Sequence, residues 1–379
     1  MQPIYFPGKL VVGPGTLAQL ADDVRSLAPS KVFLLTIPPL LEAITPLMQA
    51  LEDAGREVRV DTGIAQEPSF GDFHRLLAEA ESFGPDAVLG IGGGSALDVA
   101  KLVAAMCGNE QRLEEVVGNG LLRRRTTRLI CVPATSGTGS EVSPNAILID
   151  DADHQKKGII SPFLVPDVVY VDPLLTVSVP PAITAATGLD ALTHCLEAYT
   201  NRFAQPLVDG YALDGIRRIA AHLVQAVRDG SDIQARSEVA LGSLLGGFCL
   251  GPVNTAAVHA LAYPLGTSYQ LPHGLSNALL LPYVMAYNVP AAESRYADVA
   301  RALGCPEGLT IRETAEAGID RVRELVAACG IPARLRDAGV LEEDLPALAG
   351  DALKIQRLLK NNPREITLAD AVSIYQAAF

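Results

Sequence analysis

The feature of this sequence that most constrains its fold is an alternation of β-type and helical segments in the first half of the chain. Apolar runs that are typical of strands recur at residues 31–36, 86–91, 128–133 and 168–173, and residues 57–61 show the apolar–polar alternation of a further strand. Helical stretches separate them, for example residues 40–54 and 70–83. Strands that alternate with helices favour a parallel sheet with helices on both of its faces. We therefore predict an α/β domain over residues 1–179.

The second half of the chain has a different pattern. After Pro180 and Pro181, runs rich in Ala and Leu with helical periodicity dominate, and clusters of β-branched residues are few. Examples are residues 182–200 and 207–228. We predict an all-helical domain over residues 180–379, which follows the first domain without a flexible linker.

The composition excludes several classes of protein. With 49% hydrophobic and 19% charged residues, the chain has too much apolar content for a disordered protein. Its net charge of −13 argues against nucleic-acid binding, and we expect the short basic run 123–125 to be a solvated loop. The six cysteines form no Cys-x-x-Cys pair, and no uninterrupted apolar stretch reaches the roughly 18 residues that span a membrane. We therefore predict a cytoplasmic protein without a membrane partner.

A glycine-rich turn follows the predicted strand that ends at Ile91. The residues are Gly92, Gly93, Gly94 and Ser95, and a helical segment begins directly after them. Glycines let a ligand approach the backbone closely, and a helix start offers free N–H groups and a positive dipole end to a pyrophosphate. The spacing differs from the Gly-x-Gly-x-x-Gly pattern. Taken alone, the run is equally compatible with a tight turn that binds nothing.

A second loop with related chemistry follows another predicted strand. Residues 135–140 contain four hydroxyl side chains and two glycines, which can hold a ribose, a phosphate or a carboxamide. A surface turn rich in Ser and Thr is the alternative interpretation of this loop by itself. Two such loops at the carboxyl ends of parallel strands favour a ligand site, because open α/β sheets bind ligands at that edge.

One aspartate and three of the six histidines stand out in the second half. Asp190 and His194 lie four residues apart in a predicted helix, so both side chains share one face. A buried Asp–His hydrogen bond is one interpretation of that pair. His259 and His273 occur in apolar surroundings, where a single histidine is typical of a core residue. One carboxylate and three imidazoles that converge would suit Fe²⁺ or Zn²⁺, whereas Mg²⁺ and Ca²⁺ require more oxygen ligands.

Together these segments resemble the iron-containing, or group III, alcohol dehydrogenases. They occur in the order and at the spacing of that family and cover most of the chain. The resemblance implies a Rossmann-like, dinucleotide-binding α/β domain and an all-helical metal-binding domain, the architecture shared with dehydroquinate synthase. It also implies an active site between the two domains.

The resemblance assigns roles to individual residues. The implied metal ligands are Asp190, His194, His259 and His273. The pyrophosphate would lie on Gly92, Gly93, Gly94 and Ser95. The other implied cofactor contacts are Asp98 and Thr138 near the nicotinamide, Thr135 and Ser136 in the cofactor cleft, Lys156 near the ribose, and Val179 at the domain junction.

Two positions depart from common members of the family. Many members carry an Asp after the strand that corresponds to residues 31–36, where it binds the adenosine ribose and disfavours a 2′-phosphate. This chain has Ile37 there, so we predict NAD as the cofactor but keep NADP open. Tyr263 replaces a histidine that can relay a proton in many relatives. The unperturbed pKa of Tyr is about 10, so we expect Tyr263 either to shape the pocket or to be a poor relay.

These features predict a metal-dependent, NAD(P)-linked dehydrogenase that transfers hydride between small alcohols and aldehydes, with Fe²⁺ or Zn²⁺ as a Lewis acid on the substrate oxygen. A transhydrogenase that passes hydride from a hydroxy acid to an oxo acid is the alternative. A non-catalytic nucleotide- or metal-binding protein is a further one. The family also implies a homodimer or a larger homo-oligomer.

Overall fold

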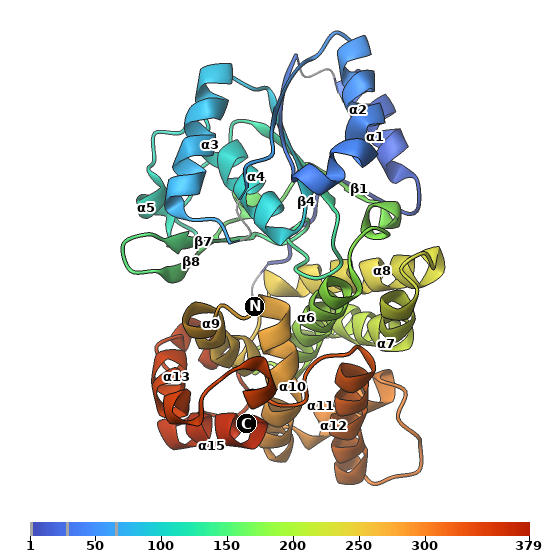
Figure 1. Ribbon diagram of the computed structural model, residues 1–379, viewed down its shortest axis with the longest axis vertical. Coiled ribbons are helices and arrows are strands. Elements are labelled where there is room, and N and C mark those ends of the chain that lie inside the picture. The colour runs from blue at the N-terminus through green and yellow to red at the C-terminus, as the bar shows by residue number, and fades with distance from the viewer. Residues whose placement is uncertain (1–2, 28–29, 65–66) are drawn as a thin grey trace. The chain divides into compact units, whose positions relative to one another are not determined.

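The computed structural model describes residues 3–27, 30–64 and 67–379 of the chain (Figure 1). These residues form two compact units. Residues 4–135 and 139–178 make up one, which we call the α/β unit, and residues 136–138 and 179–379 belong to the other, which we call the helical unit. The domain limits inferred from the sequence, 1–179 and 180–379, stay a prediction.

The α/β unit is built on a six-stranded parallel sheet, which confirms the predicted fold class. Its strands follow one another in the order β1-β9-β6-β4-β2-β3. Their bounds in that order are Lys9–Val12, Val168–Val171, Arg128–Pro133, Ala87–Gly92, Lys31–Leu35 and Glu57–Asp61. The central strand β4 is buried over its whole length, whereas the edge strand β3 has no fully buried residue. This gradient explains why the central strands read as continuous apolar runs in the sequence.

Helices cover both faces of this sheet. Helices α1 (Thr16–Leu27) and α2 (Leu41–Asp53) lie on one side of it, and α3 (Phe70–Phe83) and α4 (Gly94–Met106) lie on the other (Figure 1). Buried leucines and isoleucines of α1 and α2 pack against β2, β4 and β6 in one apolar cluster. Local signals fix the limits of α3, because Ser69 and Asp72 form a capping box at its start and Gly84 ends it with a positive φ of 66°.

Two parts of the α/β unit were not expected from the sequence. The first is the edge strand β1, whose apolar run, residues 10–12, is short and mostly exposed. The second is a small sheet of β5 (Gly118–Asn119), β8 (Gln155–Ile160) and β7 (Asn145–Asp150), with β7 and β8 antiparallel. The turn between β7 and β8 is rich in charged residues, and the two strands are only partly buried, with two buried residues in β7 and one in β8.

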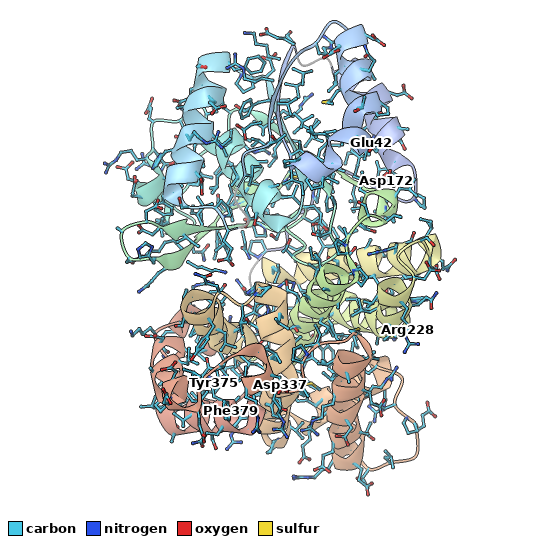
Figure 2. The ribbon with its side chains drawn as sticks, in the orientation of Figure 1. Glu42, Asp172, Arg228, Asp337, Tyr375 and Phe379 are labelled. Atoms are coloured by element: carbon cyan, nitrogen blue, oxygen red, sulfur yellow. The ribbon has the colours of Figure 1, made fainter. Side chains whose placement is uncertain are left out.

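The basic run 123–125 is only in part the solvated loop that we expected. Arg125 donates from Nη1 and Nη2 to the carboxylate of Asp167 at 2.5 and 2.9 Å, and it also bonds the carbonyl oxygens of Phe163 and Val165. These bonds tie the segment before β9 to the start of β6. Asp172, labelled in Figure 2, closes the other end of β9 by accepting hydrogen bonds from the backbone N–H groups of Gly15 and Leu17.

The second unit consists of helices and short 3₁₀ turns over its described residues, as predicted. Three long helices come first: α6 (Pro181–Thr200), α7 (Pro206–Arg228) and α8 (Ile233–Leu250). The remaining helices are α9 (Ala257–Tyr269), α10 (His273–Asn288), α11 (Glu293–Ala302), α12 (Ile311–Ala328), α13 (Leu345–Ala352), α14 (Gln356–Leu359) and α15 (Leu368–Ala378). Helix α6 is the central element, because nearly every residue from Gly188 to Thr200 is buried.

Two further expectations concern the whole chain. All six cysteines are free thiols, and five of them are buried. Across residues 3–27, 30–64 and 67–379, we find no helix with the length and apolar character that a membrane crossing requires.

Candidate metal centre and nucleotide-binding turn

Helix α6 carries two of the predicted metal ligands on one face. Asp190 and His194 are one helical turn apart, and their side chains are 4% and 6% exposed. Nε2 of His194 lies 3.6 Å from Oδ1 of Asp190. The sequence pattern therefore places both groups together, inside the most buried helix of the unit.

Two other helices begin beside this face and bring the remaining histidines. His259 lies in the first turn of α9, and His273 is the first residue of α10. The residue after His273 explains the close approach of α10. A Cβ atom on Gly274 would lie 2.2 Å from the carbonyl oxygen of Ala186, so only glycine lets α10 start this close to α6.

The structure brings the four predicted ligands together around Asp190. Nε2 of His259 is 3.4 Å from Oδ1 of Asp190, and Nε2 of His273 is 3.7 Å from the same oxygen. The ligand atoms of these three residues all lie within 4.8 Å of one another. His194 is the fourth member, since its ring stacks on that of His259 with centroids 4.8 Å apart.

These distances fit a divalent metal. Ligand atoms about 2.1 Å from a tetrahedral Zn²⁺ are separated from one another by about 3.4 Å. The side-chain NH₂ of Asn277 supports the same conclusion, because its nitrogen lies 2.7 Å from Oδ1 of Asp190 and 3.2 Å from Nε2 of both His259 and His273. Three potential ligand atoms thus lie around one side-chain nitrogen, as they would around a cation.

Electrostatic effects keep the carboxylate of this cluster ionised. Burial by itself would raise the pKa of Asp190, but the charges of His194 and His273 and the hydrogen bond to His259 outweigh it and lower that pKa. Burial lowers the pKa of His194, which favours its neutral, metal-binding form. For His259, the nearby carboxylates of Glu197 and Asp190 outweigh burial and raise the pKa.

The glycine turn joins β4 to α4 in the α/β unit. Gly93 is the N-cap residue of α4, and no side chain caps that helix end. A Cβ atom on Gly92 would lie 2.7 Å from Cβ of Ala96, so the turn itself excludes a side chain there. A Cβ atom on Gly93 would meet only Thr135, at 3.5 Å. The first turn of α4 therefore has N–H groups that suit a phosphate, next to a residue of the second loop.

Asp98 and Lys101 have a structural role that the sequence did not reveal. Lys101 is fully buried and donates to Oγ and the carbonyl oxygen of Ser140, both at 2.9 Å. Asp98 accepts hydrogen bonds from the hydroxyl of Ser140 and from the backbone N–H of Ile147, at 2.9 Å for the latter. Both side chains thus fasten the segment before β7 to α4. The predicted contact of Asp98 with the nicotinamide stays a prediction.

The loop after β6 is divided between the two units. Thr135 belongs to the α/β unit, whereas Ser136 and Thr138 group with the helical unit. Gly137 explains this grouping, because a Cβ atom there would lie 2.7 Å from Cβ of Thr187 on α6. The cofactor contacts predicted for Thr135, Ser136 and Thr138 are untested.

Comparisons with known proteins match this arrangement over almost the whole chain. Residues 7–173 match the model of the iron-containing alcohol dehydrogenases, and residues 184–379 match that of the C-terminal part of the Fe-containing alcohol dehydrogenase family. The chain belongs to the iron-containing alcohol dehydrogenase family. It is therefore an oxidoreductase of alcohols and aldehydes, as the resemblance predicted.

Individual members of the family show how widely their named substrates differ. Long-chain-alcohol dehydrogenase 1 of Geobacillus thermodenitrificans is 40% identical over 99% of this chain and 96% of its own length. A crystal structure of 1,3-propanediol oxidoreductase superposes with a TM-score of 0.96 at 35% identity, covering both chains fully. Sulfoacetaldehyde reductase from Bifidobacterium kashiwanohense, solved with NAD⁺, superposes with a TM-score of 0.90 at 27% identity and covers 100% of this chain and 98% of its own.

Tyr263, for which the sequence predicts a role in the pocket or in proton relay, lies beside the metal cluster. Its ring centroid is 5.8 Å from that of His273. Its hydroxyl oxygen accepts a hydrogen bond of 3.1 Å from Nη2 of Arg357, whose guanidinium lies over the Tyr263 ring. Pocket shaping and proton relay both stay predictions for this residue.

Three other predicted contacts lie elsewhere. Lys156 is on β8, and its Nζ forms a 2.6 Å ion pair with Glu67. The carbonyl oxygen of Val179 accepts hydrogen bonds from Arg236 and Thr184 at the start of α6. Ile37 follows β2 and packs against the apolar cluster of the sheet. None of these placements by itself tests the cofactor role.

Sequence reasoning missed two residues of the metal cluster. Asn277 follows His273 by one helical turn on α10, and Glu197 follows Asp190 by seven residues on α6. A signal for both was present, since spacings of four and seven residues place side chains on the same helix face. A polar residue on the ligand-bearing face of an otherwise apolar helix is the pattern to search for.

Proposed function

We propose that this chain interconverts small alcohols and aldehydes by hydride transfer to and from NAD, with a divalent metal held by Asp190, His194, His259 and His273. The observation that carries the proposal is the convergence of imidazole nitrogens on one buried carboxylate oxygen, at separations of 3.4 to 3.7 Å. A metal bound there supplies Lewis acidity toward a substrate oxygen.

The chain's own residues prepare the centre. Asp190 provides the one negative charge in the ligand set, and the buried imidazoles of His194 and His259 exclude water from one side of it. The side chain of His273 is 30% exposed, so the centre opens on the side of His273 and Tyr263. We place the substrate oxygen on that side.

NAD is supported by two observations. The glycine turn presents the first-turn N–H groups of α4, which have no side-chain cap, in the way that pyrophosphate-binding helices do. The relative from Bifidobacterium kashiwanohense was solved with NAD⁺. We keep NADP as the second cofactor, because Ile37 provides no charge against a 2′-phosphate.

The test begins with protein stripped of metal and reloaded anaerobically with Fe²⁺ or Zn²⁺. Oxidation of NADH and of NADPH is then followed with short-chain aldehydes, long-chain aldehydes and oxo acids. We expect turnover only after metal is restored. His259→Ala should abolish both metal retention and turnover, whereas the control His222→Ala, on α7 outside the cluster, should retain both.

Two other outcomes would change the assignment. Turnover between a hydroxy acid and an oxo acid without added free cofactor would show the transhydrogenase. Binding of metal and nucleotide without turnover of any tested substrate would show a non-catalytic binding protein. We expect neither.

Assembly and location complete the proposal. We infer a homodimer or a larger homo-oligomer in the cytoplasm, with a small-molecule alcohol or aldehyde as the substrate and without nucleic acid or membrane partners. Light scattering coupled to size-exclusion chromatography measures the oligomeric state directly.

A further inference from the structure

A single polar stripe runs along α6. Asp190, His194, Glu197 and Asn201 are spaced by four, three and four residues, so they follow one face of the helix. The first two are metal ligands in the proposed function. Glu197 is only 3% exposed and lies in a helix interior, where an isolated carboxylate is costly unless it is hydrogen-bonded.

The partners of Glu197 all lie at the start of α9. Its Oε2 accepts hydrogen bonds from Nδ1 of His259 at 2.6 Å and from the backbone N–H of Ala256 at 3.0 Å. Its Oε1 accepts one from the backbone N–H of Val258 at 2.6 Å. Ala256 is the N-cap residue of α9 and has no capping side chain of its own. A carboxylate from α6 therefore caps α9 and contacts a metal ligand with the same group.

We propose that Glu197 is a positioning residue of the metal centre, which holds the Nδ1–H of His259 and thereby leaves Nε2 to bind a metal beside Asp190. An ionised carboxylate only accepts hydrogen bonds, so the ring nitrogen that faces it must carry the proton. Nε2 is then the ring nitrogen left to bind a metal, and it lies 3.4 Å from Oδ1 of Asp190. Carboxylates that orient histidine ligands in this way are a general feature of metal sites.

His194, the histidine on α6 itself, has no such carboxylate partner for its buried Nδ1 among the described residues. His194 is held by its place on α6, one turn from Asp190, whereas His259 comes from a helix that starts after an irregular segment. Asn201 clamps that segment as well, because its side-chain amide donates to the carbonyl oxygen of Asn254 at 3.1 Å. His259, the ligand that follows the irregular segment, is thus the one whose ring is hydrogen-bonded to a carboxylate.

Glu197→Gln separates positioning from capping. A glutamine side chain fits the same space. Its oxygen can still accept from the backbone N–H of Val258, whereas the Ala256 N–H loses its acceptor when the NH₂ group takes the place of Oε2. The NH₂ group can donate to Nδ1 of His259 and shift the ring proton to Nε2, which blocks metal binding. The matched control is Glu238→Gln on α8, where the carboxylate pairs with Arg218 in the same unit.

The experiment measures the dissociation constant of Zn²⁺ by competition with a chelator, for wild type and both variants. We expect Glu197→Gln to weaken Zn²⁺ binding about 10- to 100-fold, with the control within twofold of wild type. A drop in thermal stability of the metal-free protein with an unchanged dissociation constant would show that Glu197 only caps α9, and would overturn the proposal.

A second measurement decides the question even if the variant does not fold. In metal-stripped wild-type protein labelled with ¹⁵N-histidine, the nitrogen shifts of His259 report which ring nitrogen carries the proton. Protonation at Nδ1 supports the proposal, and a neutral ring protonated at Nε2 overturns it. The inference rests on the proposed function only for the binding of a metal, so tight Zn²⁺ binding without turnover would defeat that function while leaving this inference intact.

Discussion

The glycine turn before α4 and the cluster around Asp190 are both candidate binding sites, but the first offers backbone groups to its ligand and the second offers side chains. The turn uses backbone N–H groups from neighbouring residues and depends on the absence of side chains at Gly92 and Gly93. The cluster uses side chains from α6, α9 and α10 and depends on further residues that hold those side chains in place. We therefore expect the turn to lose its ligand when a methyl group is added at a glycine. We expect the cluster to lose its metal when a ligand side chain is removed.

The largest effect is expected from Asp190→Ala. The substitution removes the only carboxylate among the proposed ligands and leaves three imidazoles, so metal content should fall to background and turnover by about 10³-fold or more. Binding of NADH, followed by fluorescence titration, should stay within twofold of wild type. Asp214→Ala, at an ion pair on α7, serves as the control. Full metal content in the variant would contradict the assignment of this cluster.

The pKa values of two buried carboxyl groups, Asp190 in the helical unit and Glu141 in the α/β unit, shift in opposite directions. Charge interactions with the histidines lower the pKa of Asp190, whereas burial raises the pKa of Glu141 in the α/β unit to about 7. The native state then binds the Glu141 proton more tightly than the unfolded chain, where the pKa of Glu is about 4.3. The contribution to stability is complete below the unfolded value and is lost as the pH rises through about 7.

The pH-dependent contribution of Glu141 to stability can be measured by comparison with the variant Glu141→Gln. The free energy of unfolding of wild type, relative to that of the variant, should fall by about 2–3 kcal/mol between pH 5 and pH 8. Urea denaturation at several pH values provides both quantities. If the two proteins show the same pH dependence, the buried carboxyl of Glu141 is ionised across that range and the contrast with Asp190 disappears.

The sequence predicts features that depend on neighbouring residues better than features that depend on residues far apart in the chain. The parallel sheet and its helices follow from contiguous runs such as residues 86–91, and the pair Asp190 and His194 follows from helical spacing. Strand β1 was missed because its apolar run, residues 10–12, is only three residues long. The structure and the comparisons with known proteins confirmed the fold class that periodicity and the family resemblance predicted.

The residues that support each site were the hardest to predict. Glu197 and Lys101 act through partners far away in the sequence, at Ala256 to His259 and at Ser140. A helix periodicity shows that such a polar residue faces the core, but not which loop meets it there. Only the tertiary structure identifies Glu197 as the cap of α9 and Lys101 as the anchor of the segment before β7.

A smaller effect distinguishes the two glycines of the turn. A Cβ atom on Gly92 would collide with Ala96, so Gly92→Ala should destabilise the protein by about 1–3 kcal/mol, which thermal or urea unfolding measures. Gly93→Ala has space for the methyl group and should leave stability unchanged, while it weakens NADH binding about tenfold by holding the pyrophosphate away from the backbone. Equal NADH affinity in Gly93→Ala and wild type would show that the turn does not contact the cofactor.

The smallest effect is expected at Ile37, which follows β2 in the same unit. Ile37→Asp places a negative charge where the family resemblance locates the adenosine ribose, so it should repel a 2′-phosphate and leave NADH binding nearly unchanged. We expect the ratio of NADPH to NADH efficiency to fall about tenfold, with metal content as in wild type. Ile37→Asn, which is polar but uncharged, controls for the lost apolar packing on the sheet. A ratio that moves equally in both variants would mean that the charge at this position does not face the ribose, and the adenosine end of the cofactor would then have to be placed elsewhere.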